Sequence, residues 1–462
     1  MNYTFENKNI HIRHFNFYYL SIFIFLLIYV YLVFLFPSVI IPFIFLGFLL
    51  LILLYLIRKQ KFENRKETIL LYLFTSGFYG LLIVISHLIF IQNPETDYFF
   101  AKDTLTFFKV GQHLGNKDIT DIYKYDLSIF NYTDFYFYAI ISGIIYKIGL
   151  IFHCNDYHFL LVLFNALLGG LTISLTFKCA CVERENKFSS FIWFILFSPI
   201  LLNSTILLRD IFITLIYTWI YLYVITDHCR NRLFKIGLLV IFSFFLRPEN
   251  GLFALSFIFL WLWSKRDQFS KKAKFAIYIG IFIILMLLIP YVLNVTTNTL
   301  SAYNERDLSI ASEDSMGAMV KRLPIPINYI GAFMFLQIMP FPFYQFLLTE
   351  NGGIITILTI ISPFYWIYLL AVTFISLWIN KAKILKFNNL SFWTLLLCLL
   401  YVVLIANGET NVRRAMPVYP IIFTIYLIYK NYLSQNFKFN IARSSVIAML
   451  FLNLVYLSIK FI

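Results

Sequence analysis

Two charged residues interrupt an apolar segment of the chain. In "FFLRPENGLF" (244–253), Arg247 and Glu249 flank Pro248, between the runs "IGLLVIFSFFL" and "GLFALSFIFLWLW". Each run rises only about 16–20 Å as a helix, which places the two charges at the tip of a short hairpin, below the membrane surface. An ionisable residue at such a depth costs several kcal/mol unless it meets water or a partner. We favour a polar cavity that opens outward; the alternatives are a pairing of Arg247 with Glu249 and a locally thinned bilayer.

Further arginines are predicted on the same side of the membrane. Arg209 lies in "SPILLNSTILLRDIF", Arg322 in "MVKRLPIP", and Arg413 and Arg414 in "ANGETNVRRAMPVYPII". Guanidinium groups match phosphate oxygens in bidentate geometry. Together with Arg247 and Glu249, these arginines predict a binding site for a phosphate-bearing lipid. The alternatives are ordinary headgroup contacts and, for Arg209, a charged helix end at the interface.

Carboxylates that could act as a catalytic base precede this set in the chain. Asp97 follows directly after a predicted span, in "NPETDYFFAKD", and Asp103 comes six residues later. A carboxylate at the mouth of a helical bundle could act as general base on a lipid-attached substrate. Asp97 is our first candidate and Asp103 our second; the alternative for each is a solvated surface acid. The stretch "DYFFAKDTLTFFKVGQHL" around them has the spacing of an interfacial helix.

The rest of the chain must position these residues from within a membrane. Of its 462 residues, 61% are hydrophobic and 13% charged, whereas a soluble domain has roughly half apolar and a quarter charged residues. Apolar runs of about 20 residues recur throughout, and in lipid only helices or closed barrels satisfy their own backbone. The alternating pattern of a barrel strand is absent. We therefore predict an all-α polytopic transmembrane bundle of about 12 to 14 spans in a single membrane domain over residues 1–462. Candidate spans lie near 17–36, 38–57, 68–92, 134–153, 158–178, 188–207, 211–228, 275–294, 354–379, 390–406, 417–433 and 444–459.

The distribution of basic residues predicts the orientation of the spans. The net charge of +14 is explained by the excess of Lys and Arg in cytoplasmic loops rather than by nucleic-acid binding. The basic connections are 58–66, 229–235, 264–274, 380–386 and 438–443, which leaves 93–133, 295–353 and 407–416 outside. Between 93–133 and 229–235 the crossings must be odd in number, yet four apolar runs lie there. Either one run is re-entrant or interfacial, with 134–153 as our suspect, or the spans are divided differently from the ranges given above.

The order of these motifs resembles that of the GT-C superfamily, polytopic glycosyltransferases that use polyprenyl-phosphate-linked sugars. The resemblance rests on "ETDYFFA", "LVLFNALLGGLTISLTFKCA", "SPILLNSTILLRDIFITL", "FFLRPENG" and "RRAMPVYPIIFTIY". It implies that Asp97 is the acid of the first outer loop and that Arg247 and Arg413 or Arg414 contact the lipid phosphate. In this chain two predicted spans precede residue 68, which is a departure from that order. The chain is also similar to O-antigen and capsule polymerases, which use a polyprenyl diphosphate carrier.

These features lead to an expected function. We expect a glycosyltransferase or polymerase of cell-surface polysaccharide in a bacterial inner membrane, because the Phe, Ile, Tyr, Lys and Asn bias is typical of AT-rich surface-polysaccharide genes. Its expected partners are a polyprenyl-(di)phosphate-linked sugar donor, a glycan or lipid acceptor and membrane lipid. We expect no cofactor and find no metal ligand set, and a divalent metal remains an open alternative. The alternatives are a flippase of lipid-linked oligosaccharide and a non-catalytic scaffold.

Replacing Asp97 tests its assignment as catalytic base. Asp97→Asn keeps the size of the side chain but removes its basicity, so we expect glycan transfer to be abolished while the protein still inserts and folds. The measurement is the surface glycan profile of cells that carry only the variant. An unchanged profile would remove Asp97 from the site.

Overall fold

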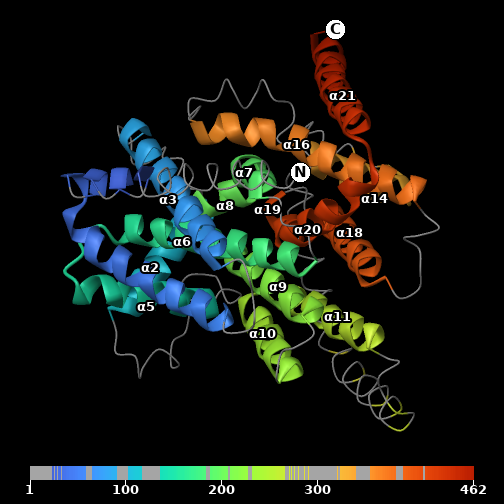
Figure 1. Ribbon diagram of the computed structural model, residues 1–462. Helices are drawn as coiled ribbons and strands as arrows, with labels where there is room; N and C mark the ends of the chain where they lie inside the picture. The colour runs from blue at the N-terminus through green and yellow to red at the C-terminus, as the bar shows by residue number, and fades with distance from the viewer. Residues whose placement is uncertain are drawn as a thin grey trace, which may run out of the picture. The chain divides into compact units, whose positions relative to one another are not determined.

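The computed structural model describes most of the apolar segments of the chain (Figure 1). Asp97 and Arg322 lie outside the described residues, and the outer segment 93–133 is described only at 102–116. The described residues are 34–58, 65–90, 102–116, 136–183, 188–205, 209–226, 231–265, 323–339, 354–380, 389–408 and 412–461, with single positions between 23 and 32 and between 270 and 320.

Every regular element among the described residues is helical. Five of these helices are long and apolar enough to cross a membrane by length and composition. They are Pro37–Leu56, Lys66–Ser86, Tyr157–Val182, Ile357–Ile379 and Gln435–Val455. The prediction of an all-α, membrane-embedded bundle is confirmed, and the total of about 12 to 14 spans stays a prediction.

The helices belong to two compact units. Unit 1 comprises Met1–Leu215 and Tyr344–Ile361, and unit 2 comprises Ile216–Phe343 and Ser362–Ile462. Unit 1 holds α2 (Pro37–Arg58), α3 (Arg65–Phe90), α4 (Lys102–Gly115), α5 (Tyr136–Ile151), α6 (Tyr157–Val182), α7 (Phe188–Phe197), α8 (Ile200–Thr205) and the start of α9 (Asp210–Ile225). Unit 2 holds the rest of α9, then α10 (Arg232–Leu246), α11 (Pro248–Ser264), α14 (Ile327–Ile338), most of α16 (Ile354–Ile379), α18 (Leu390–Gly408), α19 (Val412–Ala415), η4 (Met416–Val418), α20 (Tyr419–Tyr429), η5 (Lys430–Tyr432) and α21 (Gln435–Phe461).

Helix α6 is the centre of unit 1. Every residue from Phe159 to Ala180 is buried, and α2, α3, α5, α7 and α8 pack against it. A helix that is apolar on all sides is expected in the interior of a bundle. Ser174 Oγ donates a hydrogen bond of 3.1 Å to the Thr68 carbonyl oxygen of α3. Such a bond ties two helices together where no water competes.

Two glycines let the neighbours of α6 approach closely. A Cβ at Gly170 would overlap Ser76 Oγ and lie 2.9 Å from the Tyr72 carbonyl oxygen, both of α3. A Cβ at Gly169 would overlap Ser204 of α8. Small residues at helix interfaces permit this approach, which supplies the van der Waals contact that lipid cannot replace.

The predicted span 188–207 is wrong as a single helix. It consists of α7 and α8, which are separated by Ser198 and Pro199 and rise only about 15 Å and 9 Å. Proline lacks the N–H that would bond to the carbonyl four residues earlier, which is that of Ile195. The Tyr79 hydroxyl of α3 donates to this carbonyl at 3.1 Å and so replaces the missing bond. By contrast, α5 in the suspected segment 134–153 is continuous over Tyr136–Ile151.

The helix predicted around "AKDTLTFFKVGQHL" is present as α4. Its buried residues Phe107, Val110 and Leu114 recur every three or four positions, and α4 packs against α5. A Cβ at Gly111 would lie 2.7 Å from Ser142 Cβ, so the two helices are in close contact. The location of α4 in the membrane interface stays a prediction.

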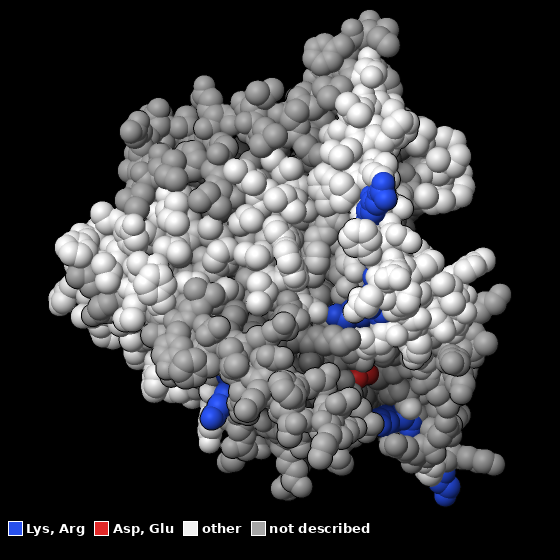
Figure 2. Space-filling view, turned by 45° about the horizontal axis from the view of Figure 1, so that its top comes forward, with Lys and Arg blue, Asp and Glu red and all other residues white. Residues whose placement is uncertain are grey.

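Much of the described surface is apolar, as expected where a protein meets lipid. Figure 2 shows a face on which few of the described residues are charged. Large apolar side chains are exposed on α2 (Phe48, 59%), α10 (Phe234, 73%) and α21 (Phe451, 62%). Exposed apolar side chains of this size are expected on helices that meet a membrane or another protein.

Replacing Gly170 tests the close contact between α3 and α6. We expect Gly170→Ala to destabilise the protein by about 1–3 kcal/mol, because the added methyl group meets the backbone of α3. The measurement is the melting temperature of the purified protein in detergent. Gly237→Ala is the matched control: Gly237 lies inside α10 with nothing within 4 Å of a Cβ, and alanine favours a helix by about 0.5–1 kcal/mol over glycine. A melting temperature that falls no further for Gly170→Ala than for Gly237→Ala would contradict this packing.

Candidate functional site

The tip of a helical hairpin places Arg247 and Glu249. The backbone of Arg247 is extended (φ −165°, ψ 116°) between α10 and α11, and Pro248 is the first residue of α11. Proline disfavours the helical conformation for the residue before it and suits the first position of a helix. The Phe244 ring occupies the space of a Cβ at Gly251, so the two helices lie close together. The predicted hairpin is present, but its arms have 15 and 17 residues and are longer than the predicted runs, because α10 begins at Arg232 and α11 begins at Pro248.

Arg247 and Glu249 form an ion pair. Arg247 Nε lies 3.3 Å from Glu249 Oε1, and the two side chains are 7% and 40% exposed. Glu249 lies in the first turn of α11, where the helix dipole favours a carboxylate. Of the open alternatives, the pairing of these two charges is observed. It lowers the cost of burying the guanidinium group, so the burial of Arg247 does not by itself require a cavity.

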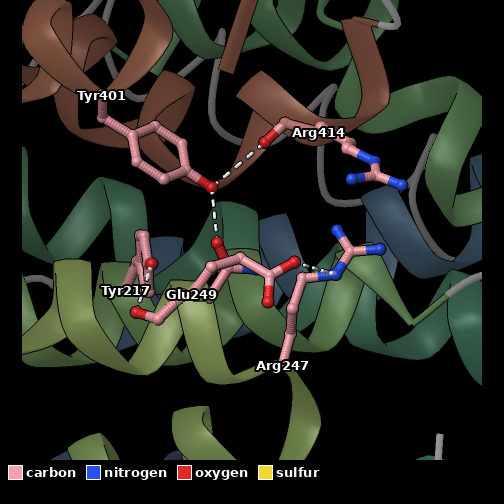
Figure 3. A network of polar contacts seen from close by, with 6 residues as sticks. Tyr217, Arg247, Glu249, Tyr401 and Arg414 are labelled. Atoms are coloured by element: carbon pink, nitrogen blue, oxygen red, sulfur yellow. Dashed lines mark hydrogen bonds and ion pairs between the residues drawn. The ribbon is translucent and has the colours of Figure 1, made fainter. Parts of the chain in front are cut away.

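A hydroxyl group links this tip to the segment that carries Arg414. The Tyr401 hydroxyl of α18 lies 2.7 Å from Asn250 Oδ1 and 3.1 Å from the Arg414 carbonyl oxygen (Figure 3). Its single proton is shared between these two acceptors. Asn250 is in turn bonded to the tip, because its N–H donates to the Arg247 carbonyl oxygen at 3.0 Å. The structure therefore brings Arg247, Glu249 and Arg414 into one network.

The two arginines extend to the same side of this network. Figure 3 shows the guanidinium groups of Arg247 and Arg414 beyond the Glu249 carboxylate, away from Tyr217 and Tyr401. Arg247 is buried, whereas Arg414 is half-buried. We call the set Arg247, Glu249, Asn250, Tyr401 and Arg414 the arginine network.

Local sequence explains the position of Arg413 and Arg414. Both belong to the single turn α19, which is followed by the 3₁₀-helix η4. Pro417 cannot donate the hydrogen bond of a continuing α-helix, which favours the change of helix type. Met416 and Val418 are fully buried and anchor the turn. Arg413 is half-buried next to Arg414.

The other end of the α10–α11 hairpin carries cations stacked on aromatic rings. Arg232, at the start of α10, lies 5.5 Å from the ring centroid of Trp261 near the end of α11. Lys235 lies 5.6 Å from that of Tyr223. Aromatic rings and cations at helix ends are typical of the cytoplasmic membrane interface. Arg247 follows the 15 residues of α10, about 22 Å along the helix axis from this end. That is less than the thickness of a bilayer core, about 30 Å.

Arg209 belongs to a separate buried cluster in unit 1. Arg209 and Asp210 are 6% and 3% exposed at the start of α9. Their charges act on the Tyr138 hydroxyl of α5, which also bonds to the Asn165 side chain of α6. Asn165 is buried in the small-residue helix on which the family resemblance partly rests.

The structure does not test the predicted catalytic acids. Asp97 and Arg322 lie outside the described residues, and Asp103 lies near the start of α4 with an undescribed side chain. Within the described part of the chain, no group of three or more His, Cys, Asp and Glu side chains could hold a metal ion. The arginine network itself holds two arginines and one carboxylate, that of Glu249 (Figure 3).

Sequence reasoning missed the two tyrosines and the asparagine that organise this site. Tyr217 Oη donates to the Asn250 carbonyl oxygen at 2.7 Å, and Tyr401 bonds to its side chain. Asn250 is next to Glu249 in "RPEN", and this position could have indicated that it belongs to the site. Tyr401 lies 151 positions away from Asn250 and is one of 32 tyrosines, so nothing local marks it.

Comparisons with known proteins give no relative. A scan against protein-family models, a search of curated proteins and a search of solved structures found no match to this chain.

Labelling of introduced cysteines tests the orientation of the hairpin. In a background without the five native cysteines, we expect Glu249→Cys to react with a membrane-impermeant maleimide in intact spheroplasts. Lys265→Cys, at the basic end of α11, is the control and is expected to react only after permeabilisation. If only Lys265→Cys were labelled in intact spheroplasts, the hairpin would have the orientation opposite to the predicted one.

Proposed function

We propose that this protein is an integral membrane glycosyltransferase of cell-surface polysaccharide assembly, of the bacterial inner membrane. Its donor is a sugar or repeat unit on a polyprenyl-(di)phosphate carrier, and its acceptor is a glycan or lipid at the outer face. Arg247, Arg413 and Arg414 bind the lipid phosphate, and Asp97 is the candidate general base. The order of motifs that resembles the GT-C superfamily and the O-antigen polymerases supports this proposal.

The observation that carries the proposal is the arginine network. Two arginines from segments far apart in the sequence meet at the tip of a membrane hairpin, where an isolated cation would be costly. A phosphate group offers each guanidinium a bidentate partner, and the lipid tail attached to it would remain in the surrounding membrane. Cations held in place also stabilise the negative charge that develops on a departing lipid phosphate.

Glu249 has a role in the same proposal. Without substrate its carboxylate neutralises part of the charge of Arg247, at 3.3 Å from Nε. Its side chain is 40% exposed, which leaves it room to turn away when a phosphate approaches. Glu249 therefore takes the position on Arg247 that an oxygen of the phosphate would take.

A flippase of lipid-linked oligosaccharide is the second candidate. The division of the segment 188–207 into α7 and α8 favours a flippase, because discontinuous helices are common in transporters. A transporter produces no chemical change in detergent, whereas a transferase still forms product from added donor and acceptor. Sugar transfer by the purified protein in micelles therefore separates the two classes.

Substitution of Arg247 tests the phosphate-binding role. We expect Arg247→Ala to lower the rate of glycan transfer roughly 100-fold, the usual loss when one stabilising donor is removed from a reacting centre. Arg247→Lys should not restore the rate, because an ammonium group lacks the planar fork of a guanidinium. The measurement is product formation from a lipid-linked donor.

Arg443→Ala supplies the matched control for this test. Arg443 is exposed on α21, so its removal takes away the same charge at a distance from the hairpin along the chain. We expect a rate close to that of the unsubstituted protein. Full activity of Arg247→Ala in a protein of normal abundance would leave Arg247 with a structural role only.

A further inference from the structure

Tyr401 lies where the two arginine-bearing segments of the site meet. A continuous series of hydrogen bonds runs from the Arg247 carbonyl oxygen to the Asn250 N–H (3.0 Å), and from Asn250 Oδ1 to the Tyr401 hydroxyl (2.7 Å). The same hydroxyl bonds to the Arg414 carbonyl oxygen (3.1 Å). The positions of the two arginine backbones are thus tied to each other through one phenol group.

Both ends of this link are held rigidly. The Tyr401 ring is 4% exposed and packs in a tilted arrangement against Phe253 of α11, with centroids 4.2 Å apart. Asn250 is 1% exposed, and Tyr217 of α9 binds its carbonyl oxygen. Neither side chain can turn without losing a buried hydrogen bond, and a buried polar group left unpaired costs about 1–3 kcal/mol.

Two guanidinium groups on one side of a network repel each other, and the Glu249 carboxylate at 3.3 Å from Arg247 Nε offsets part of this repulsion (Figure 3). The separation of the two main chains limits the positions that the two groups can take. Binding of one phosphate by both groups needs their geometry to be correct to within about 0.5 Å. The Tyr401–Asn250 link connects the main chains of these two arginines by hydrogen bonds.

We propose that Tyr401 and Asn250 are positioning residues that hold Arg414 against the hairpin tip, so that Arg247 and Arg414 together grip a single lipid-linked phosphate group. This inference rests on the proposed function. Tyr401 does not itself contact the phosphate; it acts through the main chain of Arg414. The two arginines then discriminate in favour of a phosphate that can accept hydrogen bonds from both sides, which an isolated surface arginine does not do.

Binding of farnesyl phosphate, a short polyprenyl phosphate, to the purified full-length protein tests this inference. Tyr401→Phe removes only the hydroxyl and keeps the ring against Phe253, and we expect it to weaken binding roughly five- to tenfold. Tyr79→Phe is the matched control, because Tyr79 is a fully buried tyrosine whose hydroxyl also bonds to a helix carbonyl, that of Ile195. We expect both variants to lower the melting temperature by a similar amount, and only Tyr401→Phe to weaken binding.

A double substitution distinguishes positioning from a general loss of stability. If Tyr401 acts through Arg414, Tyr401→Phe should weaken binding no further when Arg414→Ala is already present, because interacting residues are not additive. Independent, additive losses in the double variant would overturn the inference, as would wild-type affinity of Tyr401→Phe.

The same measurement separates this inference from the proposed function. If the wild-type protein does not bind farnesyl phosphate, or binds it no better than Arg247→Ala does, the proposed function fails and the positioning role fails with it. If the wild type binds and Arg247→Ala does not, the phosphate site stands. The affinity of Tyr401→Phe then decides the positioning role alone.

Discussion

The cost of holding the Arg247 guanidinium inside an apolar hairpin is the constraint on which the arrangement of unit 2 depends. A buried cation is tolerated only with partners, and the partners come from the turn that follows it. Pro248 directs the backbone out of α10, Glu249 supplies a carboxylate at 3.3 Å, and Asn250 binds the Arg247 carbonyl oxygen. Asn250 then recruits Tyr401 from α18. The turn that carries Arg247 is therefore also the place where α11 and α18 are connected by a hydrogen bond.

A comparable constraint applies in unit 1, where the group that needs a partner is a backbone carbonyl and not a charge. Pro199 removes the helical partner of the Ile195 carbonyl, and Tyr79 of α3 replaces it. In lipid an unpaired carbonyl costs several kcal/mol, so this bond permits α7 and α8 to separate. The close contacts at Gly169 and Gly170 bring α3 and α8 to α6 at the same region of the unit. The interruption between α7 and α8 is therefore stabilised by contacts with the neighbouring helices.

The charges of the hairpin are segregated between its two ends, which bears on function. Arg232 and Lys235 lie over aromatic rings at the basic end, an arrangement typical of interfacial anchors. Arg247 and Arg414 are held by hydrogen bonds and an ion pair at the tip. The ion pair orients the Arg247 guanidinium, and the hydrogen bond from Tyr401 holds the main chain of Arg414.

The sequence by itself determined the membrane class, the all-helical architecture and the hairpin around Arg247, because apolar length and a proline next to a buried charge act locally. The sequence also left the pairing of Arg247 with Glu249 open as an alternative, because these two residues are close together in the chain. It could not decide which prolines interrupt a helix: Pro42 and Pro363 lie inside continuous helices, whereas Pro199 ends one. Nor could it identify Tyr401 as the partner of Asn250, 151 positions away. Both outcomes depend on which side chain of another helix reaches the unpaired group, and only the tertiary structure brings that side chain within hydrogen-bonding distance.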